Sequence, residues 1–259
     1  MKDWDPQLYR KFETERTRPA KELLAQITTT DALHVTDLGC GPGNSTELLV
    51  AAWPQAQVTG IDTSEAMLTQ ARERLPKCDF LYADIQSWHP DTPQNVIYAN
   101  ASLQWLNEHD TLLPHLINQL TAGGTLAIQM PDNLNEPSHR LMREVAAQAS
   151  WNALIGAQAL DRKKLLTAER YYDLLTETGC EVNIWRTTYY HVMPDISAVI
   201  SWLKATGLRP FLAPLDDAQQ NAFLEAYHEQ LSMAYSSRAD GQILLSFPRL
   251  FIVAMKKHT

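Results

Sequence analysis

Long apolar runs, basic charge and cysteine are all scarce in this sequence. No stretch approaches the roughly 20 apolar residues that cross a bilayer, and the opening residues, MKDWDPQLYR, lack the apolar segment of a secretory signal. Lys and Arg number 22 against 30 Asp and Glu, so the net charge of −8 lacks the basic footprint that nucleic acid or an anionic membrane requires. Three separated cysteines, Cys40, Cys78 and Cys180, predict neither a disulfide framework nor a zinc site.

These absences indicate the setting and the partners. The few cysteines favour a reducing compartment, so we expect a cytoplasmic protein. The eight histidines show no metal-ligand spacing, so we expect no metal. We expect a small-molecule partner, with no nucleic acid, no membrane and no obligate protein partner indicated.

Strand and helix patterns alternate in the first half of the chain. This rhythm is typical of an α/β fold whose parallel sheet is covered on both faces. We expect Pro19 in the first turn of a helix, and side-chain caps at Asn44 or Ser45 and at Thr63 or Ser64. Strands are predicted over 34–38, 57–62, 79–84, 95–100 and 123–130, and helices over 45–53, 64–75 and 109–120.

The second half is less regular. Helical patterns cover 136–150 and 167–178, and a long strand covers 181–192. A segment of helices and loops follows over 195–240, and 242–257 contains a closing strand. Because no linker separates these parts, we expect one domain over 1–259. Its core would span about 30–135, 167–195 and 241–257, with an N-terminal arm (1–29) and a substrate-side lid (195–240).

The stretch VTDLGCGPGNSTELL places three glycines, Gly39, Gly41 and Gly43, between a strand and a helix. Ligands of open α/β sheets bind at the carboxyl ends of the strands, and glycines there let a backbone approach them closely. A dinucleotide would require the third glycine one residue later. An acid before the loop, Asp37, would repel a phosphate and suits an ammonium group, which favours S-adenosylmethionine.

The next three strand ends carry suitable polar residues in the expected order. Asp62 lies about 20 residues beyond the glycines, where an acid can accept both ribose hydroxyls. Asp84 can accept from the adenine amino group, Ile85 can pack the ring, and Asn100 can line the methionine side. The predicted cofactor-binding set is Asp37, Gly39, Cys40, Gly41, Asp62, Thr63, Asp84, Ile85 and Asn100.

Together these motifs make residues 34–130 resemble class I S-adenosylmethionine-dependent methyltransferases. The resemblance implies a Rossmann-like, seven-stranded, mostly parallel sheet of order 3-2-1-4-5-7-6 with strand 7 antiparallel. The chain contains neither the Pro-Pro pair of amino-methylating nucleic-acid enzymes nor the Pro-Cys pair of cytosine-C5 enzymes. The flanks DWDPQLYRKFETERTRPAKELL, IYANASLQWL and QMPDNLNEPSHRLMREVA are similar to the trans-aconitate 2-methyltransferase family, whereas 151–166 matches nothing in it.

That resemblance implies methyl transfer to a carboxylate of trans-aconitate, giving a monomethyl ester and S-adenosylhomocysteine. A carboxylate is already ionised at pH 7, so we expect no catalytic acid or base and a rate that comes from in-line placement. Another small carboxylic acid, a nicotinamide-dependent oxidoreductase and a non-catalytic cofactor-binding protein remain alternatives. The substrate-binding candidates are Tyr9, Arg16, Arg18, Arg186, Tyr189, His191, Arg209 and Arg249, because Arg and hydrogen-bond donors suit carboxylates.

Overall fold

The computed structural model describes residues 13–156 and 164–258, and its contacts divide the chain into two compact units. We call them the sheet unit and the helical unit and describe each by itself. The sheet unit contains residues 13–131, 165–187 and the chain from 250 onward. The described residues of the helical unit are 132–156, 164 and 188–249.

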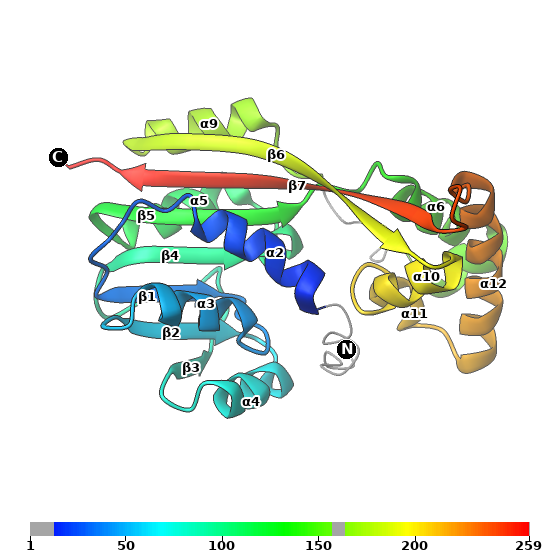
Figure 1. The fold of residues 1–259 in the computed structure, drawn as a ribbon, viewed down its shortest axis with the longest axis horizontal. Helices are drawn as coiled ribbons and strands as arrows, with labels where there is room; N and C mark the ends of the chain where they lie inside the picture. The colour runs from blue at the N-terminus through cyan, green and yellow to red at the C-terminus, as the bar shows by residue number, and fades with distance from the viewer. Residues whose placement is uncertain (1–12, 157–163, 259) are drawn as a thin grey trace. The chain divides into compact units, whose positions relative to one another are not determined.

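The sheet has seven strands in the order β3-β2-β1-β4-β5-β7-β6, which confirms the predicted order. Backbone pairing makes the neighbours among β1 to β5 parallel, and Figure 1 shows β7 running opposite to β5 and β6. Parallel strands bring their carboxyl ends to one edge. The strands are β1 (His34–Leu38), β2 (Gln57–Asp62), β3 (Asp79–Tyr82), β4 (Gln94–Asn100), β5 (Leu120–Pro131), β6 (Cys180–Met193) and β7 (Ile243–Lys256).

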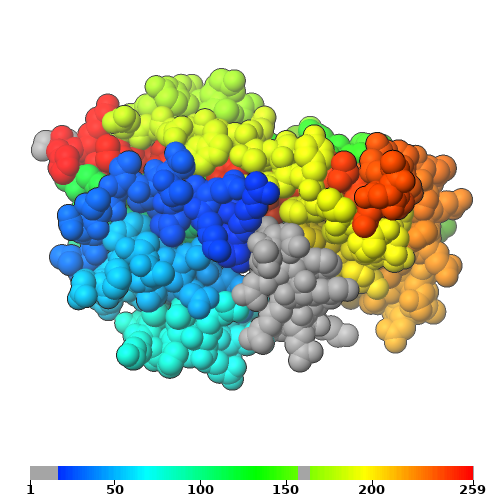
Figure 2. Space-filling view, in the orientation of Figure 1, coloured from blue at the N-terminus to red at the C-terminus, as the bar shows by residue number. Residues whose placement is uncertain are grey.

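Helices cover both faces of the sheet in the sheet unit (Figure 1). α2 (Glu13–Leu24), α3 (Asn44–Ala52) and α4 (Glu65–Arg74) form one layer, which is the continuous blue-to-cyan surface in Figure 2. Arg74 of α4 pairs with Glu47 of α3 at 3.1 Å. α5 (His109–Asn118) and α9 (Ala168–Glu177) pack against the other face.

Burial on both faces explains the apolar runs of the central strands. Leu38, Ile97 and Ile128, from three neighbouring strands, are fully buried in the largest core cluster together with Leu116 of α5. On the other face, the Tyr98 hydroxyl of β4 donates to the backbone carbonyl of Ala20 in α2 at 2.6 Å. The sheet is thereby fixed from both sides.

The helical unit has a core of its own. Trp202, Phe223, Tyr227 and Phe247 are among its buried members. An Asp216 capping box begins the longest helix, because the side chains of Asp216 and Gln219 bond each other's backbone N–H groups. The helices among its described residues are α6 (Pro137–Ala146), α7 (Ala149–Ile155), α10 (Ile196–Lys204), α11 (Arg209–Leu212) and α12 (Asp217–Ala234).

Three local predictions need correction. The N-cap residue of α3 is Gly43, with φ +88° and no side-chain hydrogen bond, so the predicted Asn44 or Ser45 cap is wrong. Pro19 lies inside α2 and not in its first turn. β3 ends at Tyr82, two residues earlier than predicted, as expected for a short strand at the edge of the sheet.

The other predicted cap is confirmed, since the Ser64 side chain accepts from the Met67 N–H. Within residues 13–156 and 164–258, no helix combines the length and the apolar character needed to cross a membrane.

Candidate functional site

The glycine loop between β1 and α3 adopts backbone angles that L side chains disfavour. Gly39, Gly41 and Gly43 have φ of +70°, +54° and +88°. A Cβ at Gly39 would lie 2.4 Å from the Cβ of Ser102, whereas one at Gly41 would meet no atom of the described chain within 4 Å. Gly39 therefore permits a close internal approach, and Gly41 leaves the outer side of the loop open to a ligand.

Asp37, the acid before the loop, is completely buried beneath it. Its Oδ2 accepts from the hydroxyls of Ser45 and Thr46, both at 2.7 Å, so it fixes the first turn of α3. Oδ1 is buried and has no hydrogen-bond partner among the described residues. Burial raises the pKa of this carboxyl from 3.8 to about 6, although the two hydroxyls act in the opposite direction. The predicted role of Asp37 toward an ammonium group stays a prediction.

Asp62 links the second strand end to the glycine loop. Its Oδ2 accepts from the Gly41 N–H at 2.9 Å, and its Oδ1 accepts from the Ser64 N–H at 2.8 Å. The carboxylate is half-buried and held from two sides, which suits recognition of a pair of hydroxyls.

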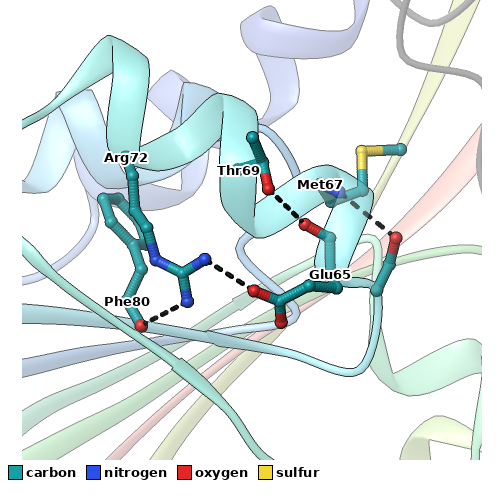
Figure 3. A network of polar contacts seen from close by, with 6 residues as sticks. Glu65, Met67, Thr69, Arg72 and Phe80 are labelled. Carbon is teal, nitrogen blue, oxygen red and sulfur yellow. Dashed lines mark hydrogen bonds and ion pairs between the residues drawn. The ribbon is translucent and has the colours of Figure 1, made fainter.

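The helix after Asp62 is tied to the neighbouring strand. Figure 3 shows Arg72 between the Glu65 carboxylate, at 2.7 Å, and the Phe80 carbonyl, at 3.1 Å. Two further hydrogen bonds complete this network. The Met67 N–H donates to the Ser64 hydroxyl, and the Thr69 hydroxyl donates to the Glu65 carbonyl. It fixes the start of α4, and with it the turn that carries Asp62.

The third strand end supplies an exposed acid and a buried apolar side chain. Asp84 is exposed, and its Oδ1 accepts from the Gln86 N–H at 2.9 Å. Ile85 is 8% exposed and belongs to the main core cluster. Thr63 is exposed. Cys40 is buried against Leu68, Ala71 and Phe80, and burial raises the pKa of its thiol well above the usual range.

The fourth strand end carries the predicted Asn100 and a serine, Ser102, that the sequence analysis missed. The Oδ1 of Asn100 and the Oγ of Ser102 are buried without hydrogen-bond partners in the described part of the chain. Between them Ala101 has φ +55°, a conformation that few residues other than glycine adopt. The polar run after Asn100 was the available signal, but pattern alone cannot predict a left-handed alanine that turns Ser102 toward Gly39.

These strand ends fit the amino-acid and ribose parts of S-adenosylmethionine. The buried oxygens of Asp37, Asn100 and Ser102 offer acceptors for an ammonium group, and the Ser102 hydroxyl can also donate to a carboxylate. The Asp62 carboxylate, held from two sides at the second strand end, suits a pair of ribose hydroxyls. The open side of Gly41 allows a ligand to lie against the backbone.

Three of the residues predicted to bind the substrate carboxylates, Tyr189, His191 and Arg249, lie together in the helical unit. The guanidinium of Arg249, a residue only 4% exposed, has its Cζ 4.7 Å from the ring centroid of Phe247 and 5.9 Å from that of Tyr189. The Tyr189 and His191 rings stack with centroids 6.3 Å apart, and the ring centroids of His191 and Trp202 are 4.5 Å apart. Aromatic faces stabilise a desolvated cation, so this cluster can present a buried positive charge to an anion.

The remaining candidates lie at other positions along the chain. Arg18 is exposed on α2 and pairs with Glu22 at 2.8 Å. Arg186 is exposed on β6, in the sheet unit, and Arg209 is half-buried at the start of α11. Tyr9 and the side chain of Arg16 lie outside the described residues.

Comparison with known proteins places the chain among methyltransferases. A family model described as a methyltransferase domain matches residues 35–124. The chain is 59% identical over 254 residues to the trans-aconitate 2-methyltransferase of Yersinia pseudotuberculosis, and the match covers 98% of both chains. It is 56% identical over 256 residues to the protein of the same name from Klebsiella pneumoniae, and this match covers 99% of both chains.

Solved structures of low identity share the fold. One is Haemonchus contortus phosphoethanolamine N-methyltransferase 2 in complex with S-adenosyl-L-methionine, at a TM-score of 0.56 and 17% identity. That match covers 93% of this chain and 53% of the longer chain. Another is the plantazolicin methyltransferase BpumL, with a TM-score of 0.51, 16% identity and coverage of 96% and 86%. At these identities the likeness concerns the fold alone.

Proposed function

Since this chain belongs to the trans-aconitate 2-methyltransferase family, we propose that it transfers a methyl group from S-adenosylmethionine to a carboxylate of trans-aconitate. The products are a monomethyl ester and S-adenosylhomocysteine. The identity of 59% over 98% of both chains carries this proposal, because it extends through the helical unit as well as the sheet. Reduced cysteines agree with a cytoplasmic location, which we include in the proposal.

We assign the cofactor to the edge where β1, β2, β3 and β4 end. When bound, S-adenosylmethionine supplies a methyl group activated on a sulfonium. Asp62 would hold the ribose, the loop from Gly39 to Gly41 would lie along the cofactor, and Asn100 would line its methionine side. Asp84 and Ile85 would bind the adenine. The orphaned buried oxygens and the open face of Gly41 support this assignment.

The chain needs no proton-transfer residue for this reaction. A carboxylate with an ordinary pKa near 4 is ionised at pH 7 and already carries the attacking lone pair. What the protein contributes is orientation, which can supply roughly 7–11 kcal/mol of the barrier when reacting groups are held in line. Side chains that bind the carboxylates which do not react are therefore the main determinants of rate and specificity.

Arg249 is our assignment for one of these anchors, with Tyr189 and His191 beside it. A guanidinium stays charged and binds a carboxylate with two parallel hydrogen bonds. Burial strengthens that interaction, and the rings of Phe247 and Tyr189 limit the directions that Arg249 can take. Arg209, Arg186, Arg18, Arg16 and Tyr9 remain candidates for the other carboxylates.

The test is methyl transfer from labelled S-adenosylmethionine to trans-aconitate, with cis-aconitate, citrate and isocitrate as competing acceptors. We expect an ester from trans-aconitate at the highest kcat/KM. No ester from trans-aconitate would refute the substrate assignment. Esterification of another acid in the panel would retain the carboxyl methyltransferase and identify a different acceptor.

An Arg249→Met variant tests the anchor. We expect its KM for trans-aconitate to rise at least about tenfold, because a charged hydrogen bond contributes roughly 1.5–3 kcal/mol. The Kd of S-adenosylhomocysteine should change less than about twofold, since the cofactor residues lie elsewhere in the chain. Arg140→Met, which removes an exposed ion pair with Glu144 on α6, is the control and should change neither constant. An unchanged KM in Arg249→Met would remove this residue from the acceptor site.

A further inference from the structure

A buried chain of hydrogen bonds runs from α9 through α5 to the turn after β4. The Tyr171 hydroxyl and the Nδ1 of His109 are 2.7 Å apart, and the Nε2 of His109 is 2.9 Å from the Leu103 carbonyl oxygen. Tyr171 and Leu103 are fully buried, and His109 is 7% exposed. All three belong to the sheet unit.

The proton positions follow from the partners. A carbonyl oxygen only accepts, so the Nε2 of His109 carries the hydrogen and donates to Leu103. In the neutral ring Nδ1 is then an acceptor, and the Tyr171 hydroxyl donates to it. Both ring nitrogens of His109 are thereby satisfied inside an otherwise apolar cluster.

Packing alone does not require this arrangement. Two buried polar side chains must first be desolvated, and an apolar pair of the same shape would fill the same volume at little or no loss of stability. An apolar pair could not hold the Leu103 carbonyl in one position, because it has no N–H group to donate to it. The hydrogen bond from His109 fixes where the Leu103 carbonyl lies, and with it the short 3₁₀ helix η1 (Leu103–Trp105).

The turn so fixed is strained. Ala101, which begins it, has φ +55°, and its N–H donates to the Gln129 carbonyl at 2.9 Å. The Gln104 side chain donates to the Ala101 carbonyl at 2.7 Å. A left-handed alanine persists only when its surroundings hold it from several sides. The His109 bond to Leu103 is one of these restraints.

Ser102 lies at the centre of this turn and faces the glycine loop. Its Cβ lies 2.4 Å, and its Oγ 3.2 Å, from the position that a Cβ at Gly39 would take. The buried Oγ has no hydrogen-bond partner among the described residues. A displacement of the turn would therefore change how Ser102 meets the loop at which we place the cofactor.

We infer that Tyr171 and His109 are positioning residues for methyl transfer. Through the Leu103 carbonyl they hold the turn at Ala101 and Ser102 against Gly39, and so set the place of the Ser102 hydroxyl at the cofactor-binding edge. Neither side chain touches the reacting atoms. The inference rests on the proposed function, because the edge it acts on is the one assigned above to S-adenosylmethionine.

Tyr171→Phe removes one hydroxyl and retains the ring. We expect kcat for trans-aconitate to fall about fivefold, the equivalent of one ordinary hydrogen bond, while KM for trans-aconitate stays the same because Arg249 is untouched. Tyr172→Phe is the matched control, since it makes the same change one residue along α9 on a side chain that is 51% exposed. Its kinetic constants should equal those of the parent.

His109 provides a second comparison. Gln can extend an N–H donor toward the Leu103 carbonyl, whereas Leu cannot. His109→Gln should therefore retain more of kcat than His109→Leu. If the two variants lose the same fraction of kcat, or if Tyr171→Phe lowers the thermal midpoint while kcat at 25 °C is unchanged, the pair has a structural role only and the inference is refuted.

Hydrogen exchange separates this inference from the proposed function. We expect Tyr171→Phe to speed amide exchange over residues 101–106, and saturating S-adenosylhomocysteine to slow it again in the variant. These effects require no methyl acceptor, so they hold even if trans-aconitate proves not to be the substrate. Equal exchange over 101–106 in parent and variant would refute the positioning role, whatever the acceptor.

Discussion

At the scale of single residues, Asp37 links the cofactor edge to pH. Its carboxyl is completely buried, and this burial raises its pKa from 3.8 to about 6. Because the folded-state pKa is the higher one, folding favours the protonated form. The stabilisation is fully present below about pH 3.8 and is lost as pH rises through about 6.

The prediction concerns Asp37→Asn, which retains an oxygen that accepts from Ser45 and Thr46. We expect the variant to gain stability relative to the parent as pH rises from 4.5 to 7.5, by about 2 kcal/mol, because about 1.5 of the roughly two pKa units between 3.8 and 6 lie in this range. Denaturant titrations of both proteins at several pH values measure the difference. Parallel stability curves across this range would show that Asp37 titrates normally.

Two glycines of the same loop should respond differently to the same substitution. Gly39→Ala adds a Cβ that would lie 2.4 Å from the Cβ of Ser102, so we expect a loss of several kcal/mol of stability. Gly41→Ala meets no described atom within 4 Å and should lose only about 1–2 kcal/mol for its left-handed backbone. The Gly41→Ala protein should nevertheless bind S-adenosylhomocysteine at least tenfold more weakly, because its methyl occupies ligand space. Calorimetry measures both quantities, and full affinity in Gly41→Ala would place the cofactor elsewhere.

The sequence allowed part of this site to be predicted at residue level. Tyr189 and His191 are two apart on one strand, so alternation alone predicts that they share a face. Their meeting with Arg249 depends on how β6 and β7 are paired, and no local pattern fixes that register. Ser102 was missed because its position depends on the left-handed Ala101, which is a tertiary constraint.

At the scale of elements, the alternation of strand and helix patterns predicted β1 (HVTDL) and β2 (QVTGID) to the residue. Ends were harder to predict wherever tertiary bonds compete with local ones. Ser45 resembles a helix cap, but its hydroxyl donates to Asp37, and Gly43 is the N-cap residue of α3.

The cap that does follow the sequence rule gives an element-scale prediction. Ser64→Ala removes the side-chain acceptor for the Met67 N–H, which is 3.3 Å away, at a buried helix start. We expect a loss of about 1 kcal/mol in the free energy of unfolding. Chemical denaturation of the variant measures it, with Glu73→Gln, at an exposed position of α4, as a control that leaves the cap and the Glu65–Arg72 pair intact. A loss below a few tenths of a kcal/mol would show that water replaces the hydroxyl.

At the scale of the whole molecule, each of the two units is built from stretches that are not contiguous in the sequence. We expected one domain with residues 195–240 as a lid. In the structure this segment is part of the helical unit, which also takes in 132–156 and the adjoining halves of β6 and β7. The sheet unit is correspondingly assembled from three separate stretches, which periodicity along the sequence does not reveal.

A fragment prediction follows from that assembly. Residues 13–131 contain β1 to β5 but lack β7, the neighbour of β5. The fragment would expose the edge of a long strand in which Thr125, Leu126, Ala127, Ile128 and Gln129 are all buried in the intact chain. We expect it to aggregate, as measured by sedimentation against the full chain. A monomeric fragment that unfolds cooperatively would contradict this.

The pairing of β6 with β7 has one more consequence. They are consecutive in the chain, adjacent in the sheet and opposite in direction, which is the relation of two strands in a β-hairpin (Figure 1). Residues 194–242 therefore occupy the place of a hairpin loop, where two to five residues usually suffice. Surface loops tolerate long insertions at small entropic cost. Evolution could thus exchange the whole insert, and with it the candidate Arg209, while the strands that carry Tyr189, His191 and Arg249 stay as they are.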